Sequence, residues 1–152
     1  MPKFKFRLQS FLNLKEQFEK QAKNELGIAN RKLQHEKRKL NRIEEDIKIY
    51  SDKFKSACTG HIQPEKIKEL KVYLEYLYDK KVKQMLNVKR EQQNVDKIRE
   101  KLVSLMRDKK VLENLKEKNF QEFLFEQEKS EQKRTDELVS YKESKKDSGQ
   151  DL

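Results

Sequence analysis

The sequence has little of what disulfide-bonded, loop-rich or membrane-spanning proteins need. Its 152 residues include one cysteine, three glycines, two prolines and no tryptophan. The lone Cys58 rules out a disulfide framework within the chain and is typical of a reducing compartment. So little glycine and proline argues against a loop-rich or disordered chain. No stretch approaches the roughly 20 apolar residues of a membrane span, and the first residues lack the apolar run of a secretory signal.

Apolar residues are also scarce, whereas charge is abundant. Hydrophobic residues make up 34% of the chain and charged residues 42%, against about 45–50% and about 25% in typical globular domains. This apolar share is too small for a compact core of several layers. Lys, Glu, Gln, Leu and Arg dominate, and these residues favour helices. The composition therefore predicts an all-α, elongated structure with a narrow apolar seam.

One interruption divides the helical pattern into two segments. Gly60 is suited to end a helix in the left-handed conformation, and Pro64 is tolerated in the first turn of the next helix. We predict a first helix over about 3–57, a turn over about 58–64 and a second helix over about 65–143. Together they form a single domain.

That predicted domain covers residues 1–144 and is a long antiparallel two-helix coiled coil, or helical hairpin, whose second helix is the longer. A short turn makes consecutive helices antiparallel neighbours. The alternative is one long parallel homodimer with a kink at Gly60 and Pro64. Residues 145–152 read as a disordered tail.

Apolar residues at heptad spacing mark a predicted seam on both helices. On the first helix it comprises Phe11, Leu14, Phe18, Ala22, Leu26, Ala29, Leu33, Leu40, Ile43, Ile47, Tyr50, Phe54 and Ala57, with Glu36 at one seam position. On the second it comprises Ile67, Leu70, Leu74, Leu77, Val88, Val95, Ile98, Leu102, Leu105, Leu112 and Leu115, with polar Lys81, Gln84, Glu91 and Lys109 between them. Two consecutive steps of four between Phe18 and Leu26 predict a stutter.

The start of the first predicted helix is amphipathic, and the end of the second extends beyond the first. The amphipathic start, with Phe4, Leu8, Phe11 and Leu12 at helical spacing among basic residues, fits either an anionic membrane surface or the first turns of a coiled coil. The second helix extends past the first, and its apolar stretch 120–125 has no expected partner within the chain.

Charge and chemistry narrow the range of functions. The formal net charge of +10 suggests an acidic partner, nucleic acid or anionic lipid, but both signs are interleaved as on a solvated helix surface. Cys58 and His61 have a C-x-x-H spacing without a second ligand pair, so we expect no metal. No phosphate loop or enclosed carboxylate suggests catalysis. We therefore predict a non-enzyme without catalytic residues or cofactors.

Aromatic residues gather near the turn on both helices. The group comprises Tyr50, Phe54, Tyr73, Tyr76, Leu77 and Tyr78. Tyrosine is enriched in binding hot spots, yet some of these side chains can pack on one another across the seam. Packing and partner binding both remain open for them.

Residues 131–138 read Glu-Gln-Lys-Arg-Thr-Asp-Glu-Leu. This stretch resembles the signature near the end of proteins of the FliJ family, which belong to the flagellar type III export apparatus. The start of the chain, Phe4-x-Phe6-Arg7-Leu8 followed by Leu12-x-Leu14-Lys15, is similar to the usual start of the family. Two internal stretches are also similar to it: Tyr50 and Phe54 with Tyr73 and Leu77, and Leu112-Glu113-x-Leu115-x-Glu117-Lys118. The resemblance covers nearly the whole chain.

The resemblance implies a non-enzymatic stalk, similar to the gamma subunit of rotary ATPases. Its expected partners are the hexameric export ATPase FliI, the export gate protein FlhA and export chaperones, which place it in the cytoplasm, peripheral to the inner membrane. The gate-side residues it implies are Tyr50, Phe54, Tyr73 and Leu77. The ring-side residues are Phe4, Phe6, Leu8, Asp136 and Glu137.

Two other readings compete with the stalk. A basic helical hairpin could bind nucleic acid, like the tRNA-contacting arm of seryl-tRNA synthetase, if its basic residues clustered along one face. A generic coiled-coil tether is the other alternative. We expect no nucleic-acid partner, because acidic residues interrupt the basic ones.

Overall fold

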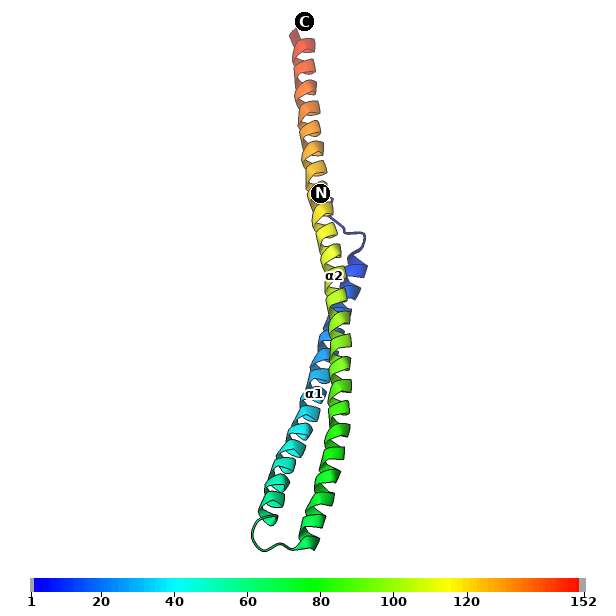
Figure 1. Ribbon diagram of the computed structural model, residues 1–152. Helices are drawn as coiled ribbons and strands as arrows, with labels where there is room; N and C mark the ends of the chain where they lie inside the picture. The colour runs from blue at the N-terminus through cyan, green and yellow to red at the C-terminus, as the bar shows by residue number, and fades with distance from the viewer. Residues whose placement is uncertain (1, 151–152) are drawn as a thin grey trace. The chain divides into compact units, whose positions relative to one another are not determined.

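Two long helices packed against each other account for the fold. The computed structural model describes residues 2–150 of the chain (Figure 1). Helix α1 covers Gln9–Ala57, 49 residues, and α2 covers Pro64–Gln150, 87 residues. The predicted all-α hairpin with a longer second helix is confirmed. Neither helix, within residues 2–150, is apolar enough over a sufficient length to cross a membrane.

The turn lies where the Gly–Pro pair predicted it. Gly60 has a φ of 79°, which is the left-handed conformation that glycine adopts without strain. The last carbonyls of α1 are satisfied locally, since the Cys58 amide donates to the Phe54 carbonyl (3.1 Å) and the Thr59 hydroxyl donates to the Ser56 carbonyl (2.9 Å). Pro64 is the first residue of α2, where its missing N–H costs no hydrogen bond.

The first helix begins six residues later than the predicted start near residue 3. Residues 2–6 are non-helical, and the Gln9 amide donates to the Phe6 carbonyl (3.1 Å) at the helix start. The first turn of α1 has no acidic residue. Starting the helix at residue 3 would add Lys3, Lys5 and Arg7 to the positive end of the helix dipole, which is unfavourable.

The second helix ends later than predicted. It continues to Gln150, past the expected end near residue 143. Residues 145–150 of the predicted tail 145–152 are therefore helical, and 151–152 lie outside the described residues.

The chain divides into two compact units. The tip unit comprises residues 18–104 and contains the turn. The terminal unit comprises residues 1–17 and 105–152. That residues 1–144 fold as a single domain stays a prediction.

Ala29, Leu33 and Val95 form the core of the tip unit. These three side chains are buried together, and Leu26, Val88 and Ile98 pack against them. Two ion pairs join the helices, Glu25 with Lys101 (3.6 Å) and Glu44 with Lys81 (4.0 Å). The residue later in α1 therefore pairs with the residue earlier in α2. The helices of this unit are therefore antiparallel, as expected (Figure 1).

The predicted seam is confirmed through most of the tip unit. Every predicted seam residue from Ala22 to Ala57 on α1 and from Ile67 to Leu102 on α2 is buried or half-buried. The polar seam positions Glu36, Lys81, Gln84 and Glu91 are also at least half-buried. Spacing alone located these positions because the heptad alternates steps of four and three, whatever the residue.

The seam near the start of α1 was predicted in the wrong phase. Phe11, Leu14 and Phe18 are exposed, Phe11 to 57%, whereas Leu12 and Glu19 are buried. In the terminal unit Lys15 reaches Asp108 (3.1 Å), and in the tip unit Glu19 reaches Lys23 (3.1 Å). These ion pairs allow charged residues to occupy heptad positions, so the steps along α1 alternate regularly and the stutter is absent.

The predicted absence of a partner for the apolar stretch 120–125 is also wrong. In the terminal unit the Phe4 ring lies 5.3 Å from the Phe120 ring and 5.5 Å from the Phe123 ring, centroid to centroid. The extended N-terminal segment thus covers part of α2. Leu124 and Phe125 remain exposed, and Leu115, predicted in the seam, is also exposed.

Candidate partner-binding surfaces

The tip unit presents a cluster of tyrosine rings. The Tyr50 and Tyr73 rings lie 4.5 Å apart, tilted by 56°, and Tyr76 lies 5.9 Å from Tyr73. The ammonium of Lys53 sits 4.6 Å from the centre of the Tyr50 ring, within the range of a cation–π interaction. We call Tyr50, Tyr73 and Tyr76 the tip aromatic cluster.

The four gate-side residues differ in accessibility. Tyr50 and Phe54 are half-buried in the seam, and Tyr73 is exposed. Leu77 is 1% exposed and is one of the most deeply buried side chains of the unit. Leu77 therefore stabilises the hairpin and offers no surface to a partner, whereas part of the Tyr73 side chain is accessible.

Two further residues at this end extend the accessible surface. Val72 and Tyr76 are exposed, Tyr76 to 55%. With Tyr73, Glu65, Lys68 and Glu69 they line a surface hollow on α2. The resemblance did not indicate Val72, but its position outside the heptad seam could have identified it.

Tyr73 is also electrostatically altered. Its partial burial against neighbouring rings raises the pKa of its phenol, and the nearby Tyr50 hydroxyl and Asp46 carboxylate raise it further. The phenol therefore stays neutral near pH 7 and can donate a hydrogen bond to a partner.

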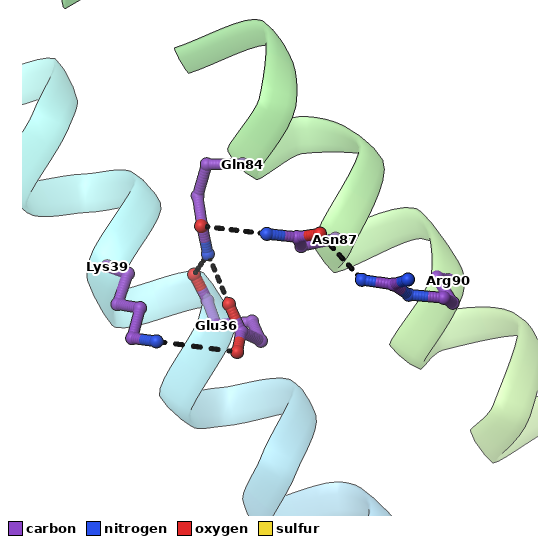
Figure 2. Close-up of polar contacts among 5 residues, drawn as sticks. All are labelled: Glu36, Lys39, Gln84, Asn87 and Arg90. Atoms are coloured by element: carbon purple, nitrogen blue, oxygen red, sulfur yellow. Dashed lines mark hydrogen bonds and ion pairs between the residues drawn. The ribbon is translucent and has the colours of Figure 1, made fainter. Parts of the chain in front are cut away.

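A polar layer crosses the seam in the middle of the tip unit (Figure 2). The Gln84 amide on α2 donates to both the carbonyl (2.9 Å) and the carboxylate of Glu36 on α1. Lys39 pairs with the same carboxylate (3.6 Å), and Asn87 donates to the Gln84 amide oxygen (3.3 Å) and accepts from Arg90 (2.7 Å). The Gln84 hydrogen bond, followed by Lys39, lowers the pKa of Glu36.

This layer specifies how the helices pair. A polar side chain in a seam weakens association overall but penalises registers in which its partner is displaced. Shifting α1 along α2 would leave the buried Gln84 amide without its acceptor. The layer therefore fixes the antiparallel register and, with it, the position of the tip aromatic cluster.

The ring-side residues lie in the terminal unit and fall into two groups. Phe6 is buried, Leu8 is half-buried and the Phe4 ring meets the Phe120 ring of α2 edge to face, so these side chains hold the N-terminal segment in place. Asp136 and Glu137 are exposed on a part of α2 where residues 128–149 are all exposed. No contact joins the first group to the second.

The terminal unit also has apolar side chains that nothing in the unit covers. On α1 these are Phe11 and Leu14; on α2 they include Met106, Val111, Leu124, Phe125, Leu138, Val139 and Tyr141. Contiguous exposed apolar surface marks interaction sites, so these side chains are candidates for contact with a partner.

Neither a metal centre nor a disulfide explains the tip. Within residues 2–150 no group of three or more His, Cys, Asp and Glu side chains could hold a metal ion. Cys58 is an exposed free thiol.

The comparisons with known proteins point to one family. A family model described as Flagellar FliJ protein matches residues 4–148. The comparisons with curated proteins and with solved structures gave no match. The matched range contains α1, the turn and nearly all of α2.

Proposed function

The chain belongs to the FliJ family of flagellar export proteins, and we propose from this that it is the stalk that links the export ATPase to the export gate. It binds a FliI-like hexamer, promotes the assembly and activity of that ring, and couples it to an FlhA-like gate protein. Escort of export chaperones is a further role in the same proposal.

The family also determines the class of protein. The chain is a non-catalytic structural protein of the flagellum, as the sequence predicted. The stalk acts through its surfaces, so each proposed partner requires a surface of suitable chemistry.

The observation that carries the proposal is the difference between the surfaces of the two units. The tip unit exposes the rings of Tyr73 and Tyr76 beside the turn, whereas the terminal unit exposes a bare helix over residues 128–149. A protein whose two units have such different surfaces is suited to bind two different partners, as a coupling stalk must.

The tip aromatic cluster supports binding of the gate protein. Tyrosine contributes a large, rigid contact area at a low cost in conformational entropy, together with a hydroxyl that can form a hydrogen bond. Tyr73, Tyr76 and Val72 provide this surface, while Leu77 and Phe54 hold the two helices in place beneath it.

The terminal part of α2 supports binding within the ATPase ring. Its side chains, including Asp136 and Glu137, are charged with both signs and are fully exposed. Exposed ion pairs are each worth only about 0–1 kcal/mol, so such a helix can contact a ring without being held irreversibly. The same attachment makes the protein peripheral to the inner membrane.

Stimulation of the partner ATPase tests the proposal. Purified FliI-like ATPase is assayed for hexamer formation and ATP hydrolysis with and without this protein. The proposal requires both to increase, and a double variant, Asp136→Ala with Glu137→Ala, to reduce the increase.

A matched control removes two acidic residues elsewhere. Glu65→Ala with Glu69→Ala changes the charge equally beside the tip aromatic cluster and should leave the ATPase stimulation intact. If the wild-type protein neither binds the ATPase nor changes its oligomerisation or turnover, the stalk proposal fails.

A further inference from the structure

Two segments of the tip unit have a large excess of basic over acidic residues. Residues 31–42 contain six basic residues and one acidic residue, and residues 80–90 contain five basic residues and no acidic one. The rest of the chain has equal numbers of acidic and basic residues, so the excess in these two segments equals the formal net charge of +10. They lie opposite each other in the tip unit, where Glu36 pairs with Gln84 (Figure 2).

Three arginines form a row on the side of α1 that faces away from the seam. The buried seam positions in this region include Leu33, Glu36, Leu40 and Ile43. Arg31, Arg38 and Arg42 are exposed and fall about half a helical turn from this seam, with His35 between the first two. The rise of a helix puts about 10.5 Å between Arg31 and Arg38 and about 6 Å between Arg38 and Arg42.

No described side chain pairs with the arginines of this row. Arg31, Arg38 and Arg42 form no hydrogen bond or ion pair with any described residue, and neither do the neighbouring Lys32 and Lys37. The one carboxylate in the segment, Glu36, is engaged by Gln84 and Lys39. Like charges so close repel one another, and an acidic partner would relieve that repulsion.

We propose that this arginine row, Arg31, Arg38 and Arg42, docks an acidic α-helix of a partner protein. A helix laid alongside α1 with carboxylates seven and four residues apart repeats the spacing of the row, so all three arginines pair at once. Arginine binds a carboxylate through two parallel hydrogen bonds, which adds geometric selectivity to charge attraction. This surface goes beyond the gate and ring contacts of the stalk.

The surroundings of the row favour protein over lipid or nucleic acid. The exposed residues on this side of α1 also include Gln34, His35, Asn41 and Glu45, with one exposed isoleucine before the row, Ile28, and one after it, Ile49. The Glu45 carboxylate repels a negatively charged lipid surface or a phosphate backbone, whereas the two isoleucines can pack against apolar side chains of a docked helix. No Phe or Tyr lies among these exposed residues to stack on unpaired bases, which single-stranded nucleic acids require.

The test uses the full-length chain and two synthetic helical peptides labelled with a fluorophore. One peptide has glutamates at positions spaced by seven and four residues on one face, and the other has the same composition with the glutamates spread around the helix. We expect the first peptide to bind with an affinity that falls as salt rises. The triple variant Arg31→Gln, Arg38→Gln, Arg42→Gln should weaken this binding about tenfold, as the loss of three exposed ion pairs implies.

Two further variants isolate geometry from charge. Replacing the three arginines by lysine keeps the charge but removes the paired hydrogen bonds, so an intermediate affinity is expected. Replacing Lys48, Lys71 and Lys97 by glutamine removes three exposed charges elsewhere in the tip unit and should have little effect. Circular dichroism checks that each variant retains its helices.

Each contrary result overturns the proposal. Equal binding of the two peptides, or equal weakening by the two glutamine variants, would show that only net charge matters. Tighter binding of a 20-base-pair DNA or RNA duplex, or of phosphatidylglycerol vesicles, would assign the arginine row to nucleic acid or lipid. Because the assay contains no ATPase or gate protein, its outcome is independent of the stalk proposal.

Discussion

Gly27 and Gly60 have opposite backbone requirements. A Cβ on either residue would meet no atom within 4 Å, but only Gly60 has a positive φ, 79°. Gly27 lies inside α1, where alanine is the better helix former. We predict that Gly27→Ala stabilises the protein by about 0.5–1 kcal/mol and that Gly60→Ala destabilises it by about 1–2 kcal/mol.

Urea denaturation followed by circular dichroism measures both changes. Since neither substitution creates a steric conflict, the two variants differ only in backbone preference. A loss of stability in Gly27→Ala would contradict the helical geometry at that residue.

Glu36 makes the stability of the hairpin depend on acidity. Its pKa in the folded state is lowered from the ordinary value of 4.5, chiefly by the Gln84 hydrogen bond. Its stabilising contribution is complete above the unfolded-state pKa and is lost as the pH falls through the lower folded-state pKa. Wild-type protein should therefore lose more stability than Glu36→Gln between pH 6 and about pH 3.

The comparison of the two proteins isolates this carboxylate from the many others that titrate in the same range. Urea midpoints at several pH values provide the measurement. Parallel pH profiles for the two proteins would mean that Glu36 contributes nothing to the dependence.

At the scale of the helices, the seam separates residues that hold the fold from residues that bind. Leu77 is almost fully buried and Tyr76, one residue earlier, is exposed. We predict that Leu77→Ala destabilises the tip unit by about 2–5 kcal/mol, because truncation of a buried leucine leaves a cavity. Tyr76→Ala should change stability by less than about 0.5 kcal/mol.

The same pair of variants bears on the gate-binding proposal. Tyr76→Ala should weaken binding to an FlhA-like protein in calorimetry while the thermal midpoint stays constant. Binding that survives this change and the further change Tyr73→Ala would remove the tip aromatic cluster from the candidates.

The N-terminal segment is an element without regular structure that nonetheless covers a helix. Phe4 contacts Phe120 and Phe123 through its ring, and such aromatic pairs are worth about 0.5–1.5 kcal/mol beyond burial. We predict that Phe4→Ala increases amide hydrogen exchange around residues 116–127 and leaves the tip unit unchanged. Phe125→Ala, at an exposed neighbouring position, is the matched control and should have no such effect.

At the scale of the whole molecule, folding and function are assigned to different parts of α2. The side chains of residues 128–149 are all exposed, so they contribute little to the packing that stabilises the hairpin. We predict that a chain ending at Gln127 keeps the thermal midpoint of the full-length protein within about 2 °C, since surface changes alter stability little. The same truncation should abolish stimulation of a FliI-like ATPase.

Differential scanning calorimetry measures the thermal midpoint of the shortened chain, and the ATPase assay measures its stimulation of the ATPase. A shortened chain that unfolds earlier would mean that residues 128–149 pack on the rest of the protein. A shortened chain that still stimulates the ATPase would place the ring contact elsewhere.

The sequence by itself determined the two helices, the turn and most of the seam. Heptad spacing identified the buried Gln84 and the half-buried Glu91 in the tip unit, although both residues are polar. The position of a residue in the heptad, and not its type, determines whether it faces the other helix. Gly60 and Pro64 located the turn because their backbone preferences act locally. Together these local signals were sufficient to predict an antiparallel hairpin.

Only the tertiary structure decided the phase of the seam at the start of α1 and the covering of Phe120. Near that start, Phe11 and Leu14 on one stripe compete with Leu8 and Leu12 on another, and apolar content does not choose between them. The choice rests on contacts distant in sequence, such as Lys15 with Asp108 and Phe4 with Phe123. Such pairs, about 90 residues apart or more, form only once α2 lies alongside, so no local pattern reveals them.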